Sequence, residues 1–465
     1  MSDQQPTPRT RSDSATEIIT SGHIWSAVWY LAWPTAVYTL IQTAYNIINR
    51  MFLGRLDDPA PALAAVGIGG QLLMLQFAIT VGLTAGSSAL VARFLGARQL
   101  DDANETARQS YILSVILGII SAIPLILAPT FLVKLIGASG SVIPLAADYT
   151  AIISWFSIPL FLWMTATTIL RSAGDVRSPL YAGLIIIVVN VLLDWFLIFG
   201  VGPIPPMGVH GAAISTGISR VAGLVVTAFF LYRSDLRGSL SHFKPHMEWS
   251  RRIMKIGWPA VIQNLMWTSA AAVYIKILAF LPGGQGTAAQ AALTVALTIE
   301  STAFMPGVAY SMAATPLVGQ NLGAGKPERA EHSAWVATGQ ATFIMTLVAI
   351  VFIAVPRSLA VAFTHDAVVV AMIVSYLRIV ALSEPFLAVN MVLRGALQGA
   401  GETRVPAWIT LFTSWIVRLP MTWALAIPAG LGATGAWIAM SSSTFLSGVL
   451  MAAWFKWGPW RQTQV

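Results

Sequence analysis

Two polar residues, Asn190 and Asp194, stand four positions apart within the otherwise apolar segment NVLLDWFLIFG. In a helix this spacing places them one turn apart on the same face. A carboxylate and an amide oxygen can together ligate a hard cation, and a carboxyl group can also bind a proton. A charge in an apolar helix costs about 2.5 to 3.5 kcal/mol on insertion scales, which favours a functional site. Alternatively, Asp194 only hydrogen-bonds polar neighbours, and the residues do not choose between H⁺ and Na⁺.

Two further ionisable residues also lie within apolar segments. Glu300, in LTIESTAFMPG, is a second carboxylate that can share an ion-binding role. The alternative is an internal glutamate bonded to neighbouring helices. Arg418, in IVRLP, is expected to pair with a polar neighbour for structural reasons. No Asp or Glu lies between Arg252 and Glu300, so this stretch supplies no further carboxylate.

Composition decides which elements carry these residues. Of the 465 residues, 56% are hydrophobic and only 10% are charged, far outside the range of soluble domains. The net charge of +8 comes from basic residues in short gaps between apolar runs, which form no continuous nucleic-acid-binding stripe. We interpret them as topology signals and contacts with anionic membrane lipid, and expect no nucleic-acid partner. Because the chain has no cysteine, disulfides and thiol nucleophiles are excluded.

About 20 apolar residues are needed to cross roughly 30 Å of hydrocarbon. Dividing the chain at charged and Gly/Pro-rich gaps predicts an all-α polytopic membrane protein with twelve transmembrane helices. The predicted spans are 25–52, 62–92, 110–136, 142–170, 179–202, 209–232, 253–281, 287–318, 334–361, 367–393, 405–429 and 433–456.

The distribution of Lys and Arg between alternate loops predicts the orientation. Most of them fall on one side, which the positive-inside rule assigns to the cytoplasm. We therefore expect both tails, 1–24 and 457–465, to be cytoplasmic in a multi-pass protein of the bacterial cytoplasmic membrane. The polar tail 1–24 lacks the apolar core of a signal peptide, and we expect it to be disordered.

The two halves of the chain repeat each other. LRSAGDVRSP and LQGAGETRVP, like LVARFLGA and LVGQNLGA, are separated by 227 residues. The polar segment 233–252 is then a cytoplasmic linker between two pseudo-symmetric six-helix lobes, 25–232 and 253–456. Since each lobe has an even number of spans, both share one orientation, as in transporters built from parallel repeats. A duplicated structural protein is the alternative.

These residues resemble the multidrug and toxic compound extrusion (MATE) family over nearly the whole folded chain. The matching segments include WPTAVYTLIQTAYNIINRMFLGRL, NVLLDWFLIFG, IESTAFMPGVAYSMAATPLVGQNLGAG and LRGALQGAGETRVP. The resemblance implies two six-helix lobes and antiport, in which amphipathic, often cationic compounds leave in exchange for H⁺ or Na⁺.

The resemblance also implies roles for particular residues. Asn190 and Asp194 belong to a first-lobe cation site, to which the hydroxyl of Thr216 in GAAIST contributes. Where the family usually has an aspartate on the first helix, this chain has Asn49 in IINRMFLG. Asn49 can ligate a cation through its carbonyl oxygen but cannot titrate. Pro34 resembles a bending point coupled to protonation, although helix shaping alone explains it equally well.

Other function classes find less support in the sequence. The GxSxG, HExxH and GxxxxGK[ST] motifs are absent, so no enzymatic chemistry is indicated. A flippase or exporter for lipid-linked or polysaccharide precursors is the runner-up, and a receptor or scaffold without transport is a third class. We expect a monomer with no cofactor or metal other than the coupling ion, and a small amphipathic molecule as substrate.

Overall fold

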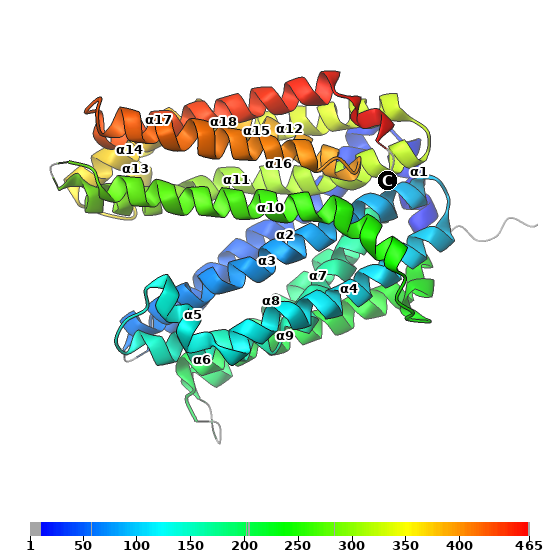
Figure 1. Ribbon diagram of the computed structural model, residues 1–465, viewed down its shortest axis with the longest axis horizontal. Helices are drawn as coiled ribbons and strands as arrows, with labels where there is room; N and C mark the ends of the chain where they lie inside the picture. The colour runs from blue at the N-terminus through cyan, green and yellow to red at the C-terminus, as the bar shows by residue number, and fades with distance from the viewer. Residues whose placement is uncertain (1–10, 57, 201, 203–204, 283, 464–465) are drawn as a thin grey trace, which may run out of the picture. The chain divides into compact units, whose positions relative to one another are not determined.

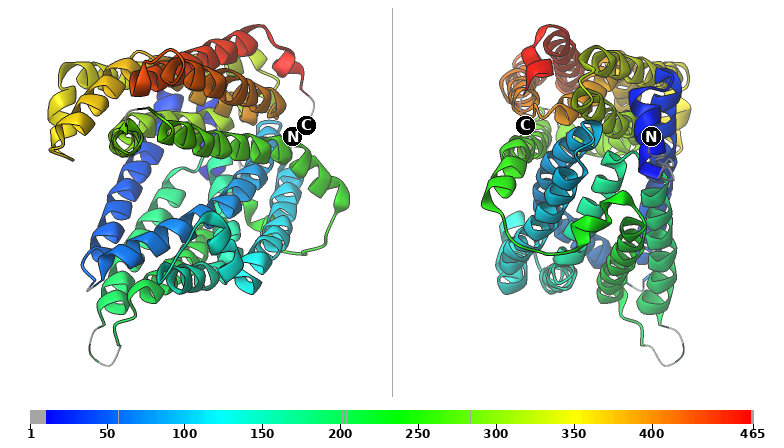
Figure 2. Two further views of the ribbon diagram at one scale, coloured as in Figure 1. Left: turned by 60° about the vertical axis from the view of Figure 1, so that its left-hand side comes forward. Right: turned by 90° about the vertical axis from the view of Figure 1, so that its right-hand side faces the viewer.

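The computed structural model describes residues 11–56, 58–200, 202, 205–282 and 284–463. This part of the chain consists of helices and loops, without a strand (Figure 1, Figure 2). The helices are α1 Arg11–Thr20, α2 Ile24–Leu53, α3 Pro59–Gly96, α4 Leu100–Leu127, α5 Pro129–Ile136, α6 Val142–Ser154, α7 Ser157–Ser172, α8 Arg177–Phe199, α9 Gly208–Tyr232, η1 Asp235–Leu240, α10 Met247–Ala279, α11 Gln285–Gly323, α12 Pro327–Ala354, α13 Pro356–Val361, α14 Ala367–Ala381, α15 Glu384–Gly399, α16 Arg404–Leu411, η2 Phe412–Arg418, α17 Leu419–Ala426, α18 Gly432–Trp457 and η3 Pro459–Gln462.

Each predicted span corresponds to a helix or to a set of consecutive helices. Within the described residues, nine helices are long and apolar enough to cross a membrane, and two bent helix pairs also pass as units. The 30-residue helix α2 covers the first predicted span. At 1.5 Å per residue it is about 45 Å long, more than the hydrocarbon thickness.

Four of the predicted spans were expected to be single helices, and each is instead divided into two helices. Spans 142–170 and 367–393 are bent pairs, with angles of 53° between α6 and α7 and 57° between α14 and α15. Spans 110–136 and 334–361 each end in a separate short helix, α5 and α13. Both short helices begin at a proline, Pro129 or Pro356, which lacks the N–H needed to continue the preceding helix.

The predicted repeat is visible in the backbone of two equivalent turns. Gly174 and Gly401, each two residues after the end of α7 or α15, both have φ of +84°, a conformation that glycine adopts without steric cost. Asp175 Oδ1 accepts the backbone N–H groups two and three residues later at 3.2 and 3.0 Å. Glu402 Oε1 accepts the equivalent pair at 3.1 and 3.3 Å. The two halves therefore fold this motif in the same way.

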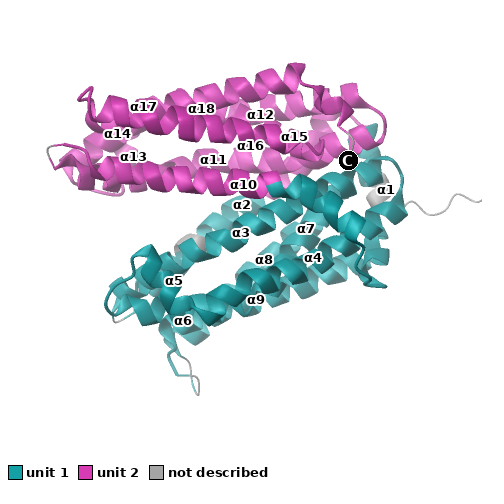
Figure 3. Cartoon of the chain, in the orientation of Figure 1, with its two compact units in different colours: residues 1–21, 37–258 teal, residues 22–36, 259–465 magenta. Residues whose placement is uncertain are grey.

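The chain forms two compact units, and two of the three limits between them fall inside helices (Figure 3). The limits lie between Ser21 and Gly22 before α2, between Ala36 and Val37 in α2, and between Trp258 and Pro259 in α10. Each of these long helices thus contributes residues to both units. In each helix the limit between the units lies close to a proline, Pro34 or Pro259. The predicted lobes, 25–232 and 253–456, were defined by the sequence repeat, whereas these units are defined by contacts in space. The lobe limits therefore stay a prediction.

The expectation of a disordered N-terminal tail is wrong for Arg11–Thr20, which forms α1. Ala15 and Ile19 are buried in the first unit. A Cβ atom built on Gly174 would lie 2.9 Å from the Ala15 Cβ, so α1 packs directly on the turn after α7. Apolar burial explains the helix, because every fourth residue faces this turn. Residues 1–10 lie outside the described part of the chain.

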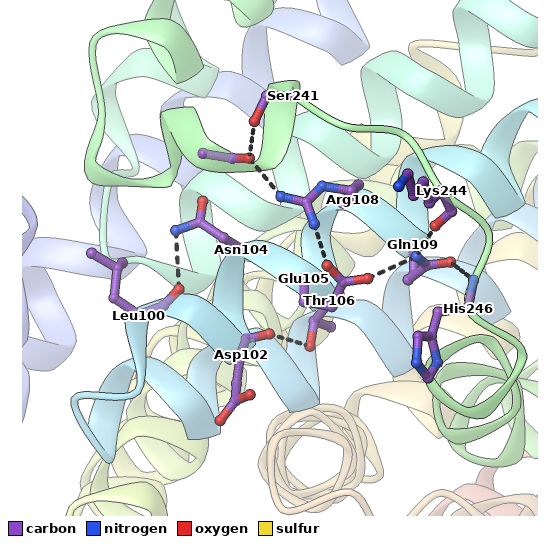
Figure 4. A network of polar contacts seen from close by, with 11 residues as sticks. Leu100, Asp102, Asn104, Glu105, Thr106, Arg108, Gln109, Ser241, Lys244 and His246 are labelled. Atoms are coloured by element: carbon purple, nitrogen blue, oxygen red, sulfur yellow. Dashed lines mark hydrogen bonds and ion pairs between the residues drawn. The ribbon is translucent and has the colours of Figure 1, made fainter.

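The predicted linker is fastened to helix α4 of the first unit (Figure 4). Arg108 Nη2 donates to the Gly238 carbonyl at 2.9 Å, and Gln109 Nε2 donates to the Lys244 carbonyl at 2.7 Å. The His246 backbone N–H donates to Gln109 Oε1 at 3.0 Å. Gln109 therefore bonds the linker from both ends of its amide group, which fixes the chain just before α10.

Replacement of this glutamine tests the attachment. Gln109→Ala should destabilise the protein by about 0.5 to 1.5 kcal/mol, because the Lys244 carbonyl and the His246 N–H lose a hydrogen-bond partner at a part-buried contact. Chymotrypsin should then cut faster after the exposed Phe243, measured by mass spectrometry of the protein in detergent. The exposed Gln71→Ala variant on α3 is the control. Equal cleavage in both variants would contradict the attachment.

Candidate functional site

Helices α8 and α9 bring two pairs of polar side chains together inside the first unit. Asp194 is 0% exposed and Asn190 is 1% exposed, on one face of the apolar helix α8. Ser215 Oγ of α9 donates to Asp194 Oδ1, and Asn190 Nδ2 donates to Ser219 Oγ at 3.2 Å. Because each helix repeats its polar residue after four positions, the two antiparallel helices form two successive polar contacts.

Three buried oxygens at this site have no hydrogen-bond donor within the described residues. They are Asp194 Oδ2, Asn190 Oδ1 and Asn49 Oδ1. A buried polar atom left without a partner costs about 1 to 3 kcal/mol. All three atoms are hard oxygen ligands of the kind that metal cations prefer, and one belongs to a carboxyl group that can take up a proton. The donor set therefore suits a small cation or a proton.

Tyr45 links Asn49 of α2 to the pair on α8. Asn49 Nδ2 donates to the Tyr45 hydroxyl at 3.1 Å. The Tyr45 side chain also interacts with Thr216 and, electrostatically, with Asp194. Thr216 itself donates to the Ala212 carbonyl at 2.8 Å. The structure thus gathers the four first-lobe residues named from the sequence, while the hydroxyl that bonds Asp194 is that of Ser215.

Arg220 of α9 is a charged neighbour that sequence reasoning did not single out as a site residue. Its side chain interacts electrostatically with Tyr45 and Tyr149, both of which also interact with Asp194. Its buried Nη1 has no hydrogen-bond partner in the described structure. The sequence could have indicated it, because Arg220 is a charged residue inside a predicted span and lies one helical turn after Thr216. A permanent positive charge therefore lies in the same group as the Asp194 carboxylate.

Pro34 and Glu300 lie apart from this cluster. Pro34 is buried in α2, about four helical turns before Asn49 and within the stretch of α2 that belongs to the second unit. Glu300 lies on α11, also in the second unit, where the Tyr376 hydroxyl donates to its Oε2. The sequence-based site is thus divided: four residues share one cluster, and these two do not belong to it.

The second unit contains a carboxyl group that sequence reasoning missed. Glu384, the first residue of α15, is 0% exposed and interacts with Glu300. An acidic residue inside the predicted span 367–393 was the signal that should have identified it. Arg418 also interacts with Glu300. Its guanidinium donates to Ser443 Oγ at 2.8 Å and to Thr444 Oγ1 at 3.3 Å, which confirms the predicted polar pairing.

Two units of membrane-spanning helices with buried ionisable clusters define a polytopic membrane transporter. The family model MatE matches residues 34–196 and again 259–424. The chain therefore belongs to the MatE family of efflux transporters, and the resemblance found in the sequence is confirmed. Both matches begin at a proline, Pro34 or Pro259, so the family model also detects the internal repeat.

Curated relatives match along almost the whole chain. A probable multidrug resistance protein NorM of Thermotoga maritima is 27% identical over 94% of this chain and 93% of the relative. The multidrug resistance protein NorM of Burkholderia vietnamiensis is 29% identical over 91% of each.

Solved structures agree with the fold. A crystal structure of MATE in complex with MaD3S has a TM-score of 0.86 and 25% identity, covering 95% of this chain and 97% of that one. A MOP superfamily transporter from Pyrococcus furiosus has a TM-score of 0.85 at 25% identity, with the same coverage. The prediction of an all-α membrane protein with two six-helix lobes is confirmed.

A double-mutant cycle measures the bond between α8 and α9. Ser215→Ala should destabilise the protein by about 1 to 2 kcal/mol, because it removes the donor to a buried carboxylate. In the Asp194→Ala background, which has no acceptor for this hydroxyl, the same change should cost about 0.5 to 2 kcal/mol less. Reversible unfolding in detergent is the measurement. Thr227→Ala, which removes a buried hydroxyl of α9 that donates to the Gly223 carbonyl, is the control. Additivity of the Ser215 and Asp194 changes would refute the contact.

Proposed function

We propose that this protein is a secondary antiporter that exports amphipathic, often cationic drugs or metabolites in exchange for H⁺ or Na⁺. Membership of the MatE family and relatives named multidrug resistance proteins support export of this kind. The observation that carries the coupling site is the set of three buried oxygens of Asn49, Asn190 and Asp194 without donors in the described structure.

In this proposal the coupling ion binds at Asp194. Without an ion the carboxylate is negative and accepts the hydrogen bond of Ser215, in a group of side chains that also holds Arg220. A bound proton or Na⁺ neutralises it and changes the interactions among α2, α8 and α9. An ion drives a conformational change only through such a difference in interaction free energy between states. Asn49 and Asn190 supply oxygen ligands but cannot titrate, so Asp194 dominates proton exchange.

The same proposal assigns α2 the part that moves. Pro34 removes one helical hydrogen bond close to the point where α2 passes from one unit to the other. A change at Asn49 is thereby carried along a helix that can bend. The protein acts as a monomer of the bacterial cytoplasmic membrane with both termini inside, with lipid and a small-molecule substrate as its partners and no cofactor besides the coupling ion.

Neutralising the carboxylate is the direct test of the coupling site. Asp194→Asn should abolish ion-driven uptake of a fluorescent cation into everted membrane vesicles, because the charge change that couples the ion is gone. The amount of folded protein in the membrane should stay unchanged. Asp148→Asn, at an exposed carboxylate of α6, is the matched control. Native exchange by Asp194→Asn, together with loss in Glu300→Gln, would assign coupling to the second unit.

Restoring a charge at position 49 tests the ligand set. Asn49→Asp should change the affinity or the identity of the coupling ion, because a second carboxylate binds Na⁺ more strongly or shares a proton with Asp194. The measurement is export under an imposed pH gradient and, separately, an imposed sodium gradient. An unchanged response to both gradients would exclude Asn49 from the site. Transport of a lipid-linked precursor, without export of the fluorescent cation, would instead support a flippase.

A further inference from the structure

An apolar groove lies at one end of the second unit, between the first turns of α16 and the last turns of α18. It has a volume of about 400 Å³, within the range of roughly 300 to 1,000 Å³ that is typical of ligand sites. The turn after α18 forms part of its wall. Apolar side chains of the two helices form the rest, namely Val405, Ile409, Leu450, Ala453, Trp454 and Trp457. Trp457 is 81% exposed, so the groove opens at the surface.

The groove lies where two membrane-spanning segments end. Arg404–Ala426 and Gly432–Trp457 are each long and apolar enough to cross a membrane. The positive-inside rule assigns Arg404 and Lys456 to the cytoplasmic side, and tryptophan side chains such as Trp457 favour the interface between lipid and water. The surroundings of the groove are therefore the boundary between the lipid tails and the head groups of the cytoplasmic leaflet.

One polar atom of the lining lacks a partner. Trp454 Nε1 is buried, and no acceptor within the described residues meets it. The Trp454 ring lies against the turn, because a Cβ atom built on Gly458 would come within 2.9 Å of Cε2, the ring carbon bonded to Nε1. The nearby Trp460 is satisfied differently, since its Nε1 donates to the Phe455 carbonyl at 2.6 Å. Because an indole N–H can only donate, an oxygen atom of a bound molecule would satisfy Trp454.

Basic side chains outnumber acidic ones around this end of the groove. Arg404, at the start of α16, is exposed, and its side chain has no ion-pair partner in the part of the chain that the structure describes. Lys456 and Arg461 share a single carboxylate, that of Glu331. The Glu402 carboxylate accepts two backbone N–H groups at the start of α16. Three positive charges thus stand against two negative ones, and this balance favours an anionic ligand.

The internal repeat indicates which residue leaves the space open. Helices α9 and α18 begin with GVHGAAI and GATGAWI, which are 224 residues apart, so Ala453 corresponds to Phe229 and Trp457 to Arg233. In the first unit the Arg233 guanidinium lies over the Phe229 ring, 4.3 Å from its centroid. The second unit therefore has a methyl group where the first has an aromatic ring covered by a cation.

We propose that this groove binds one anionic phospholipid of the cytoplasmic leaflet, with an acyl chain along the apolar lining and the head group at Arg404. The lipid buries the apolar side chains of both helices, and its phosphate or ester oxygens accept the Trp454 N–H. Basic pockets between transmembrane helices on the cytoplasmic side suit such head groups. An amphipathic cation fits less well, because the positive charge of Arg404 repels it.

Native mass spectrometry of the delipidated protein tests this site by titration with phosphatidylglycerol or with phosphatidylcholine of the same acyl chains. The unaltered protein should bind one phosphatidylglycerol more tightly than phosphatidylcholine. Arg404→Gln should weaken phosphatidylglycerol binding about fivefold, the effect of one basic residue near an anionic surface, and leave phosphatidylcholine binding unchanged. Trp454→Phe keeps the ring but removes the N–H, so both lipids should bind about 2- to 10-fold more weakly. Ala453→Phe, which introduces the residue of the first unit, should fill the groove and weaken binding of both lipids.

The repeat also supplies the matched control. Arg177 begins α8 as Arg404 begins α16, 227 residues later, and Arg177→Gln should leave the first bound phosphatidylglycerol unaffected. Equal binding by the unaltered protein, Arg404→Gln and Ala453→Phe would overturn the proposal, as would equal affinity of the unaltered protein for the two lipids. So would displacement of the bound lipid by tetraphenylphosphonium, because the groove would then take an amphipathic cation. Since these readouts measure lipid binding and not export, the result is independent of the antiport proposal.

Discussion

The cost of leaving a polar group unpaired inside a membrane constrains every part of this structure. In hydrocarbon, every backbone N–H and C=O group must find its hydrogen-bond partner within the protein. An α-helix provides these partners within a single segment. Where the chain interrupts a spanning helix, the bend is covered by other helices and tied by side chains such as Gln76 and Ser157. The same cost makes the unpaired oxygens of Asp194 and Glu384 informative, because a buried polar atom without a donor in the described structure is a candidate to bind a proton, an ion or a water molecule.

Duplication supplied two copies of one scaffold, and substitution at equivalent positions gave them different chemistry. The turns at Gly174 and Gly401 have kept the same backbone conformation and the same side-chain bonds. In contrast, Arg418 of the second unit stands where the first has Asp194, as the flanking repeats align them. Glu384 likewise replaces Ser157. The same backbone geometry with different polar residues explains how one fold holds different buried polar clusters in its two units.

Much of this arrangement could be predicted from the sequence, because hydrophobic length and the repeat are properties of the chain itself. The pairing of Asn190 with Asp194 followed from helical spacing alone. The bends did not, since an apolar run has the same composition whether the helix is straight or broken. The sequence also did not predict that Ser215, and not Thr216, donates to Asp194. Adjacent helical residues point about 100° apart, and only the packing of α8 on α9 decides which hydroxyl faces the carboxylate.

Each unit places an arginine in the same group of buried side chains as its carboxyl groups. In the first unit Arg220 and Asp194 both interact with Tyr45 and Tyr149, and Arg220 Nη1 has no hydrogen-bond partner in the described structure. In the second unit Arg418 interacts with Glu300 and donates to Ser443 Oγ and Thr444 Oγ1. A buried charge is costly unless it is paired. In the proposed antiport cycle an ion bound at Asp194 would therefore add one positive charge to a group that already holds Arg220, and this change in interaction free energy is what could drive a conformational change.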